Sequence, residues 1–170
     1  DKKIYYYDIH YKDYKNHFFG WTLSLGTASV KFSDLANAYA TLATTQKKDL
    51  CPIISITTFS GKSLSTGCNK ALADKVIKDS TSFFISDILS NIQARPTDWD
   101  WRKNLTIDNF NIAAKTGTSS KRLFNGELRA VDDVVVGYTP NNTFLMWGGN
   151  TNGKALNDGS VSIIAIAKHW

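Results

Sequence analysis

This sequence of 170 residues lacks several patterns that would assign it to a common functional class. It has only two cysteines and three histidines, and their positions give neither a CxxC pair nor another spacing typical of zinc ligands. Its 20 lysines and arginines are scattered, so the net charge of +5 forms no run of like charge and accompanies no RNA- or DNA-binding motif. We therefore expect no metal site, no cofactor and no nucleic-acid partner.

Long apolar runs and targeting segments are also missing. No stretch approaches the length of a membrane span, and no signal peptide opens the chain. There is no internal repeat, low-complexity segment or interdomain linker, and 42% hydrophobic residues suffice for a sizeable core. Because the chain opens abruptly at Asp1 and stops at Trp170 within an apolar segment, we expect it to be a piece of a longer protein.

Two helices are predicted from apolar periodicity. The first covers residues 33–45, with Ser33 as its cap and Asp34 complementing the helix dipole. The second runs from Ser80 to Asn91 and carries a broad apolar face. A final apolar segment, Ser160–Trp170, is predicted to begin a further helix.

Strands are predicted around these helices from β-branched runs and turn residues. Three candidates follow one another in the second half of the chain: Phe110–Thr118, Asp133–Tyr138 and Thr143–Gly148. The last two are separated by Thr139-Pro140-Asn141-Asn142, a good turn sequence. The expected fold class is therefore α+β, with an antiparallel sheet and helices packed on a face.

A separate hairpin is predicted near the two cysteines. Ile53–Phe59 and Lys62–Thr66 flank the tight turn Ser60-Gly61. If Phe59 faces Lys62, Cys51 and Cys68 fall nearly opposite each other, and a disulfide between them would imply an oxidising compartment. Two unpaired thiols in a reducing compartment fit the sequence equally well, so both interpretations stay open.

The most informative stretch is Ile112–Ser120, which contains Lys115-Thr116-Gly117-Thr118. A strand edge with a cation, hydroxyls and a glycine could hold an anionic acyl substrate, whereas a surface strand followed by a turn is the plain alternative. A phosphate-binding loop is excluded, because no glycine precedes Lys115 in Asn111–Ala114. An acyl-transfer site of the Lys-Thr-Gly type remains.

Several segments in the same order resemble the end of a penicillin-binding protein transpeptidase domain. Those nearest the motif are Ile112–Ser120 (IAAKTGTSS), Asp132–Pro140 (DDVVVGYTP) and Trp147–Asn150 (WGGN). Upstream, two further segments resemble the family's glycine-closed segment and the helix after it: Leu23–Gly26 (LSLG) and Ser33–Ala43 (SDLANAYATLA). Ser86–Arg95 (SDILSNIQAR) resembles the helix before the Lys-Thr-Gly strand, especially in bifunctional class A enzymes of the 1C type. The resemblance covers about residues 21–170 and implies a partial penicillin-binding protein/serine β-lactamase-like transpeptidase fold.

This resemblance implies DD-transpeptidation, the cross-linking of peptidoglycan stem peptides by serine acyl transfer, and binding of β-lactams. Lys115 would be catalytic, supplying positive charge near the nucleophile and the substrate carboxylate. The substrate-binding residues would be Thr116, Gly117, Thr118 and Ser119. Among these, the two threonine hydroxyls would bind the carboxylate, Gly117 would let the substrate backbone approach, and the Thr118 N–H would be one of two oxyanion donors. The parent protein would be membrane-anchored and extracytoplasmic, in the periplasm or on the outer face of the inner membrane.

The nucleophile of that family is missing from this sequence. No serine begins a Ser-x-x-Lys motif, and there is no Ser-x-Asn triplet. Tyr14-Lys15-Asn16 superficially resembles a Tyr-x-Asn variant, but it lies too close to Leu23–Gly26, so we interpret it as aromatic packing. We expect residues 1–170 to be the C-terminal portion of a single transpeptidase domain, inactive without the N-terminal part.

Other departures from the family favour a second hypothesis, a degenerate module that binds cell-wall peptide or a divisome partner without catalysis. Val134 stands where the family usually has tryptophan, and the connection from Ser119 to Asp132 is enlarged by a predicted hairpin tip around Lys121–Glu127. Asp132 aligns with a family aspartate, for which a structural contact and a catalytic role both stay open. A β-lactamase is a third, weaker interpretation. Whatever its function, an isolated C-terminal half of such a domain should leave strand edges and apolar helix faces uncovered.

Overall fold

The computed structural model describes residues 24–26, 28–48, 50–66, 74–157, 159 and 161–169. The chain divides into two units, Asp1–Val30 and Lys31–Trp170, and every element below belongs to the second. The Tyr14-Lys15-Asn16 triplet lies outside the described residues. Of the predicted glycine-closed segment, residues 24–26 are described, and Gly26 has a φ of 84°, which glycine adopts at no steric cost.

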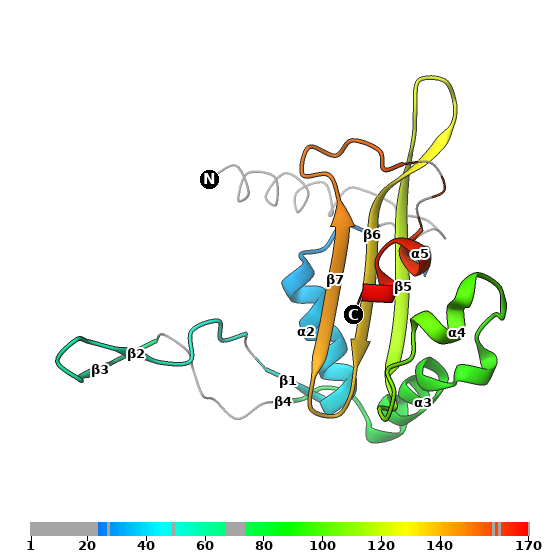
Figure 1. The fold of residues 1–170 in the computed structure, drawn as a ribbon. Helices are drawn as coiled ribbons and strands as arrows, with labels where there is room; N and C mark the ends of the chain where they lie inside the picture. The colour runs from blue at the N-terminus through cyan, green and yellow to red at the C-terminus, as the bar shows by residue number, and fades with distance from the viewer. Residues whose placement is uncertain are drawn as a thin grey trace. The chain divides into compact units, whose positions relative to one another are not determined.

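A three-stranded antiparallel sheet is the centre of this unit (Figure 1). Its strands are β5 (Ala113–Arg122), β6 (Leu128–Tyr138) and β7 (Thr143–Gly149), in the order β5-β6-β7. The valine run of β6 places the strand in the middle, where its residues are buried, and Thr139 N–H donates to Asn142 O at 2.8 Å in the turn to β7. The three predicted strands and the α+β fold class are confirmed.

The first of these strands differs in its bounds from the prediction. β5 begins at Ala113 rather than Phe110 and continues to Arg122, because β6 also begins earlier and pairs with it up to the partners Arg122 and Leu128. The enlarged connection is therefore mostly strand, with an irregularity between Ser119 and Ser120. Only Leu123–Glu127 forms the tip, where Gly126 has a φ of 86°.

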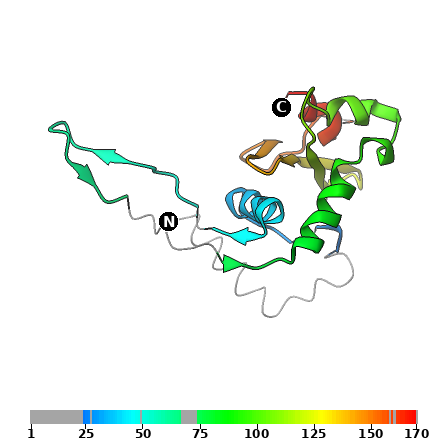
Figure 2. The same ribbon diagram turned by 90° about the horizontal axis from the view of Figure 1, so that it is seen from below.

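Helices α2 (Phe32–Thr44) and α3 (Asp79–Ser90) confirm the two predicted helices to within one residue at each end. The predicted cap is wrong: α2 begins one residue earlier, so Lys31 is its N-cap and Ser33 lies in the first turn. Figure 2 shows both helices on one side of the sheet. The Tyr138 ring lies 6.1 Å from that of Tyr39 on α2, and its hydroxyl lies 3.0 Å from Ser86 Oγ on α3. Burial, and secondly the proximity of Tyr138, raise the pKa of Tyr39.

The broad apolar face predicted for α3 is largely exposed. Phe83, Phe84 and Ile88 are each more than 60% exposed, whereas the buried residue of this helix is Ser82, whose hydroxyl donates to Leu42 O on α2. An apolar helix face open to water is expected where a packing partner is missing.

The hydrophobic core lies on the other side of the sheet, beneath α4 (Trp101–Asn104), α5 (Ser162–Ala165) and the 3-10 turn η4 (Ala167–His169). Its buried residues are Leu105, Ile112, Ala114, Val135, Ile163 and Ala167. The predicted C-terminal helix is thus one short turn of helix followed by a 3-10 turn.

The aromatic connection between α3 and α4 contains the 3-10 turns η2 (Ile92–Ala94) and η3 (Asp98–Asp100). Arg95 fastens it to the core, because its guanidinium donates to Leu105 O at 2.7 Å and to Leu89 O at 2.9 Å. Burial lowers the pKa of this guanidinium.

Two small antiparallel sheets complete the described elements: β1 (Gln46–Lys47) with β4 (Asp74–Lys75), and β2 (Ile56–Thr57) with β3 (Ser63–Leu64). The predicted hairpin is present with shorter strands and a register shifted by one residue. Thr58 N–H donates to Lys62 O at 2.8 Å, so Thr58 rather than Phe59 lies opposite Lys62.

Cys51 is disulfide-bonded. The sequence holds one other cysteine, Cys68, which lies outside the described residues. The disulfide favours the oxidising-compartment interpretation over two free thiols. Within the described part of the chain, no helix is long and apolar enough to span a membrane.

We expect Gly149→Ala to destabilise the protein by about 1–3 kcal/mol, because a Cβ there would lie 2.5 Å from the Trp147 ring and 3.0 Å from Val131 O. The free energy of unfolding in urea measures the effect. Gly117→Ala is the matched control, since no atom lies within 4 Å of its added Cβ. Equal losses in the two variants would contradict the packing explanation.

Candidate functional site

The Lys115–Thr118 stretch lies on β5, at an edge of the three-stranded sheet. β6 pairs with one side of β5, and no described strand pairs with the other. A free strand edge offers a row of N–H and C=O groups to an extended peptide or acyl substrate. Which backbone groups of β5 face the open side follows from the hydrogen bonds between the strands.

The contacts of Ser162 on α5 show which way the backbone groups of Gly117 point. Its hydroxyl donates to Gly117 O and accepts from Val134 N–H at 3.2 Å. Gly117 and Val134 are directly opposite each other in the β5–β6 register. One oxygen can reach both groups only if they point toward each other, so Gly117 turns its backbone N–H and C=O toward β6. In an antiparallel strand the next residues then turn theirs away, which leaves the N–H and C=O of Thr116 and Thr118 facing the open edge.

Side chains alternate between the two faces of β5. Lys115 and Gly117 share the face of Tyr138, which α2 and α3 contact, whereas Thr118 lies on the face of α5. The Lys115 Nζ donates to Thr116 O at 2.6 Å and forms no ion pair with a described residue. Its exposed ammonium therefore places positive charge at the open edge.

Gly117 leaves open space beside that charge. No atom lies within 4 Å of the position that a Cβ would take at this residue. The fold itself thus tolerates a side chain here, and any requirement for glycine must come from what binds to the strand.

A buried polar network occupies the opposite face. Asp133 and Ser162 are almost fully buried, with 0% and 1% exposure. Thr118 Oγ1 donates to Asp133 Oδ1 at 2.9 Å and accepts from Ser162 N–H at 3.2 Å. Thr118 is an exposed residue, but its hydroxyl, which we expected to bind a carboxylate, is hydrogen-bonded to these two buried residues. The backbone N–H of Thr118 is the group that faces the edge. Sequence reasoning missed Asp133 and Ser162, and the only signal was an aspartate next to a valine run.

Thr116 and Ser119 differ from Thr118 in their contacts. The Thr116 hydroxyl has no hydrogen-bond partner among the described residues, and the residue is half-buried on the same face of β5 as Thr118. Ser119 Oγ donates to Asp132 Oδ2 at 2.7 Å, and Trp147 Nε1 donates to Asp132 Oδ1 at 2.9 Å. Asp132 therefore makes a structural contact that joins the three strands. Trp147 also packs against Phe32 on α2, with ring centroids 5.8 Å apart.

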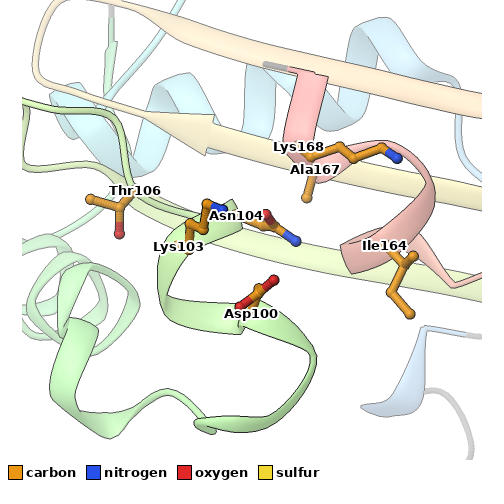
Figure 3. A pocket seen from close by; sticks show the side chains of 7 residues that line it. All are labelled: Asp100, Lys103, Asn104, Thr106, Ile164, Ala167 and Lys168. Atoms are coloured by element: carbon orange, nitrogen blue, oxygen red, sulfur yellow. The ribbon is translucent and has the colours of Figure 1, made fainter.

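Lys115 lines none of the pockets that described residues form. One of about 630 Å³ lies between α4 and α5 and is shown in Figure 3. Its lining residues are Asp100, Lys103, Asn104, Thr106, Ile164, Ala167 and Lys168. Tyr138 lines a smaller pocket of about 150 Å³, and another of about 450 Å³ lies beside α2. Within the described residues no group of three or more His, Cys, Asp or Glu side chains could hold a metal ion.

Solved structures of a penicillin-binding protein are similar to this chain. The structure of the penicillin-binding protein PonA1 from Mycobacterium tuberculosis matches with a TM-score of 0.61 and 23% identity, over 84% of this chain and 37% of that chain. The structure of PonA1 in complex with penicillin V matches with a TM-score of 0.57 and 21% identity, over 84% and 36% of the two chains. No protein-family model and no curated protein matches the chain. At this identity the likeness establishes the fold, a mixed α+β arrangement that resembles part of a penicillin-binding protein.

The two threonines provide a test of the buried network. We expect Thr118→Val to lower the free energy of unfolding by about 1–3 kcal/mol, because Asp133 loses a hydrogen-bond donor in a buried site. Thr116→Val removes a hydroxyl without a described partner and should change it by less than about 0.5 kcal/mol. Urea denaturation of both variants gives the two values, and a Thr118→Val protein as stable as the parent would contradict the network.

Proposed function

We propose that this chain is the C-terminal portion of a peptidoglycan DD-transpeptidase domain, of the bifunctional class A, 1C-like type. The observation that carries the proposal is the open edge of β5, where Lys115 places a cation beside the outward backbone groups of Thr116 and Thr118. The likeness of the fold to part of PonA1 supports it. So does the exposed apolar face of α3, which an N-terminal part of the domain would cover.

In the proposed reaction a serine outside this sequence attacks the carbonyl carbon of the D-Ala-D-Ala bond of a stem peptide. The terminal D-Ala leaves with a proton, and an amine from a neighbouring peptide then resolves the acyl-enzyme. The ammonium of Lys115 attracts the substrate carboxylate and lowers the energy of the serine alkoxide. The Thr118 N–H stabilises the developing oxyanion, for which one donor typically contributes about 3–4 kcal/mol.

The remaining edge residues bind the substrate. The Thr116 hydroxyl, which lacks a described partner, donates to the terminal carboxylate. Gly117 lets the substrate backbone approach, and Ser119, fixed by Asp132, extends the polar edge toward the hairpin tip. A β-lactam would occupy the same edge as an acyl-substrate analogue, and the PonA1 structure with penicillin V motivates this assignment.

The same proposal includes an extracytoplasmic location, with the parent protein anchored in the membrane by a segment outside this sequence. The disulfide at Cys51 supports an oxidising compartment.

A second candidate function is the non-catalytic binding module. The engaged hydroxyl of Thr118 and the presence of Val134 favour it, because both reduce the groups available for chemistry. It would bind stem peptide reversibly and form no acyl-enzyme.

Labelling of the longer parent protein with a fluorescent penicillin tests the transpeptidase proposal. We expect labelling at a serine outside this sequence, and we expect Lys115→Ala to slow it about a hundredfold or more, because the charge near the nucleophile is lost. Lys121→Ala is the matched control, a lysine on the same strand whose Nζ contacts Gly153 O instead. Labelling of a serine within these 170 residues would refute the fragment proposal, and reversible peptide binding without labelling would favour the binding module.

A substitution of Gly117 separates folding from function. We expect Gly117→Val to leave the melting temperature unchanged, since the space around this residue is open, and to reduce acylation of the parent at least tenfold by blocking the substrate backbone. Thermal unfolding and labelling rates measured on the same preparation give both results. A stable variant that is acylated at the parent rate would show that the substrate does not lie along β5.

A further inference from the structure

We propose that Ser162 on α5 is a positioning residue for the Thr118 N–H, holding and strengthening this donor from beneath the sheet. The proposal rests on the function proposed above, which assigns the Thr118 N–H to the oxyanion. Ser162 itself touches no substrate, because its side chain is 1% exposed and lies on the face opposite Lys115.

The position of the Ser162 hydroxyl fixes the direction of the Thr118 N–H. It donates to Gly117 O and accepts from Val134 N–H at 3.2 Å, so it is inserted beside a backbone pair that joins β5 and β6. Gly117 C=O and Thr118 N–H belong to one planar peptide group and point in opposite directions. A contact that fixes the carbonyl therefore fixes the direction of the N–H at the open edge.

The same contact acts on the strength of the donor. A hydrogen bond to a peptide carbonyl polarises the group, and chains of hydrogen bonds reinforce one another in a low-dielectric interior. The Thr118 N–H is thereby a better donor to an oxyanion than an edge amide whose carbonyl has no second partner. These contacts are made by groups of the protein itself, which makes the arrangement a preorganised one.

Asp133 and Thr118 decide where the single hydroxyl hydrogen of Ser162 goes. Asp133 Oδ1 lies 2.9 Å from Thr118 Oγ1 but 3.3 Å from Ser162 Oγ, so the carboxylate takes the threonine hydrogen. Ser162 N–H in turn donates to Thr118 Oγ1 at 3.2 Å. The Ser162 hydroxyl also lies 2.8 Å from Thr118 Oγ1, but that oxygen already accepts from Ser162 N–H, and Gly117 O is the closest of the three acceptors. The serine hydrogen therefore goes to Gly117 O.

The kinetic test uses the longer parent protein with Ser162→Ala. We expect the rate constant of acylation by a fluorescent penicillin to fall about tenfold, less than the loss of a whole oxyanion donor. The dissociation constant of the non-covalent penicillin complex should change less than about twofold, because Lys115 and Thr116 are untouched. Ser82→Ala is the matched control, another buried serine whose hydroxyl donates to a backbone carbonyl, here Leu42 O, and it should change neither value.

A second measurement does not depend on acylation. Labelling with ¹³C-carbonyl glycine and ¹⁵N-threonine selects Gly-Thr peptide groups by NMR, and this sequence contains two, Gly26-Thr27 and Gly117-Thr118. We expect Ser162→Ala to move the resonance of Thr118, identified by its loss in Thr118→Ser, and to leave that of Thr27 in place. Ser82→Ala should move neither.

The results separate the two proposals. An unchanged acylation rate in Ser162→Ala would overturn the positioning role, as would a loss matched by Ser82→Ala or a loss confined to the dissociation constant. If the unsubstituted parent is not acylated, the transpeptidase proposal fails. The NMR result then decides, because an unmoved Thr118 resonance overturns the positioning of this peptide group and a shifted one supports it.

Discussion

The antiparallel pairing of β5 with β6 is the constraint on which the candidate site depends. Because Gly117 and Val134 turn their backbone groups toward each other, Thr116 and Thr118 must turn theirs to the open edge. A register slip of one residue would send the Thr118 N–H toward β6 and move Lys115 to the other face of the sheet. The long valine-rich pairing that holds the register is thus as much a part of the site as the residues at its edge.

The two faces of the sheet have different roles. Beneath β5, the apolar core and the hydrogen bonds of Thr118 with the buried Asp133 and Ser162 hold the strand in place. On the face of Lys115, α2 and α3 pack beside exposed aromatic and aliphatic side chains. The underside of the sheet is therefore packed, whereas its other face carries exposed apolar side chains.

Much of this arrangement could be predicted from sequence. Periodicity located α2 and α3, the valine run located β6, and the turn residues 139–142 separated it from β7. These predictions succeeded because the residues that define each element lie within it or next to it. The bounds of β5 and the position of Ser33 were wrong, since both depend on where a neighbouring element begins. The role of Asp132 could not be chosen either, because its two donors, Ser119 and Trp147, come from different strands.

By itself the sequence determined the fold class, the location of a Lys-Thr-Gly strand and the lack of a Ser-x-x-Lys nucleophile, since these are properties of residue order. Only the tertiary structure decided that the Thr118 hydroxyl faces inward while its N–H faces the open edge. It also brought Ser162 beneath Gly117, 45 residues earlier in the chain. These facts arise from strand pairing and from the packing of α5, and no local pattern encodes contacts between such distant residues.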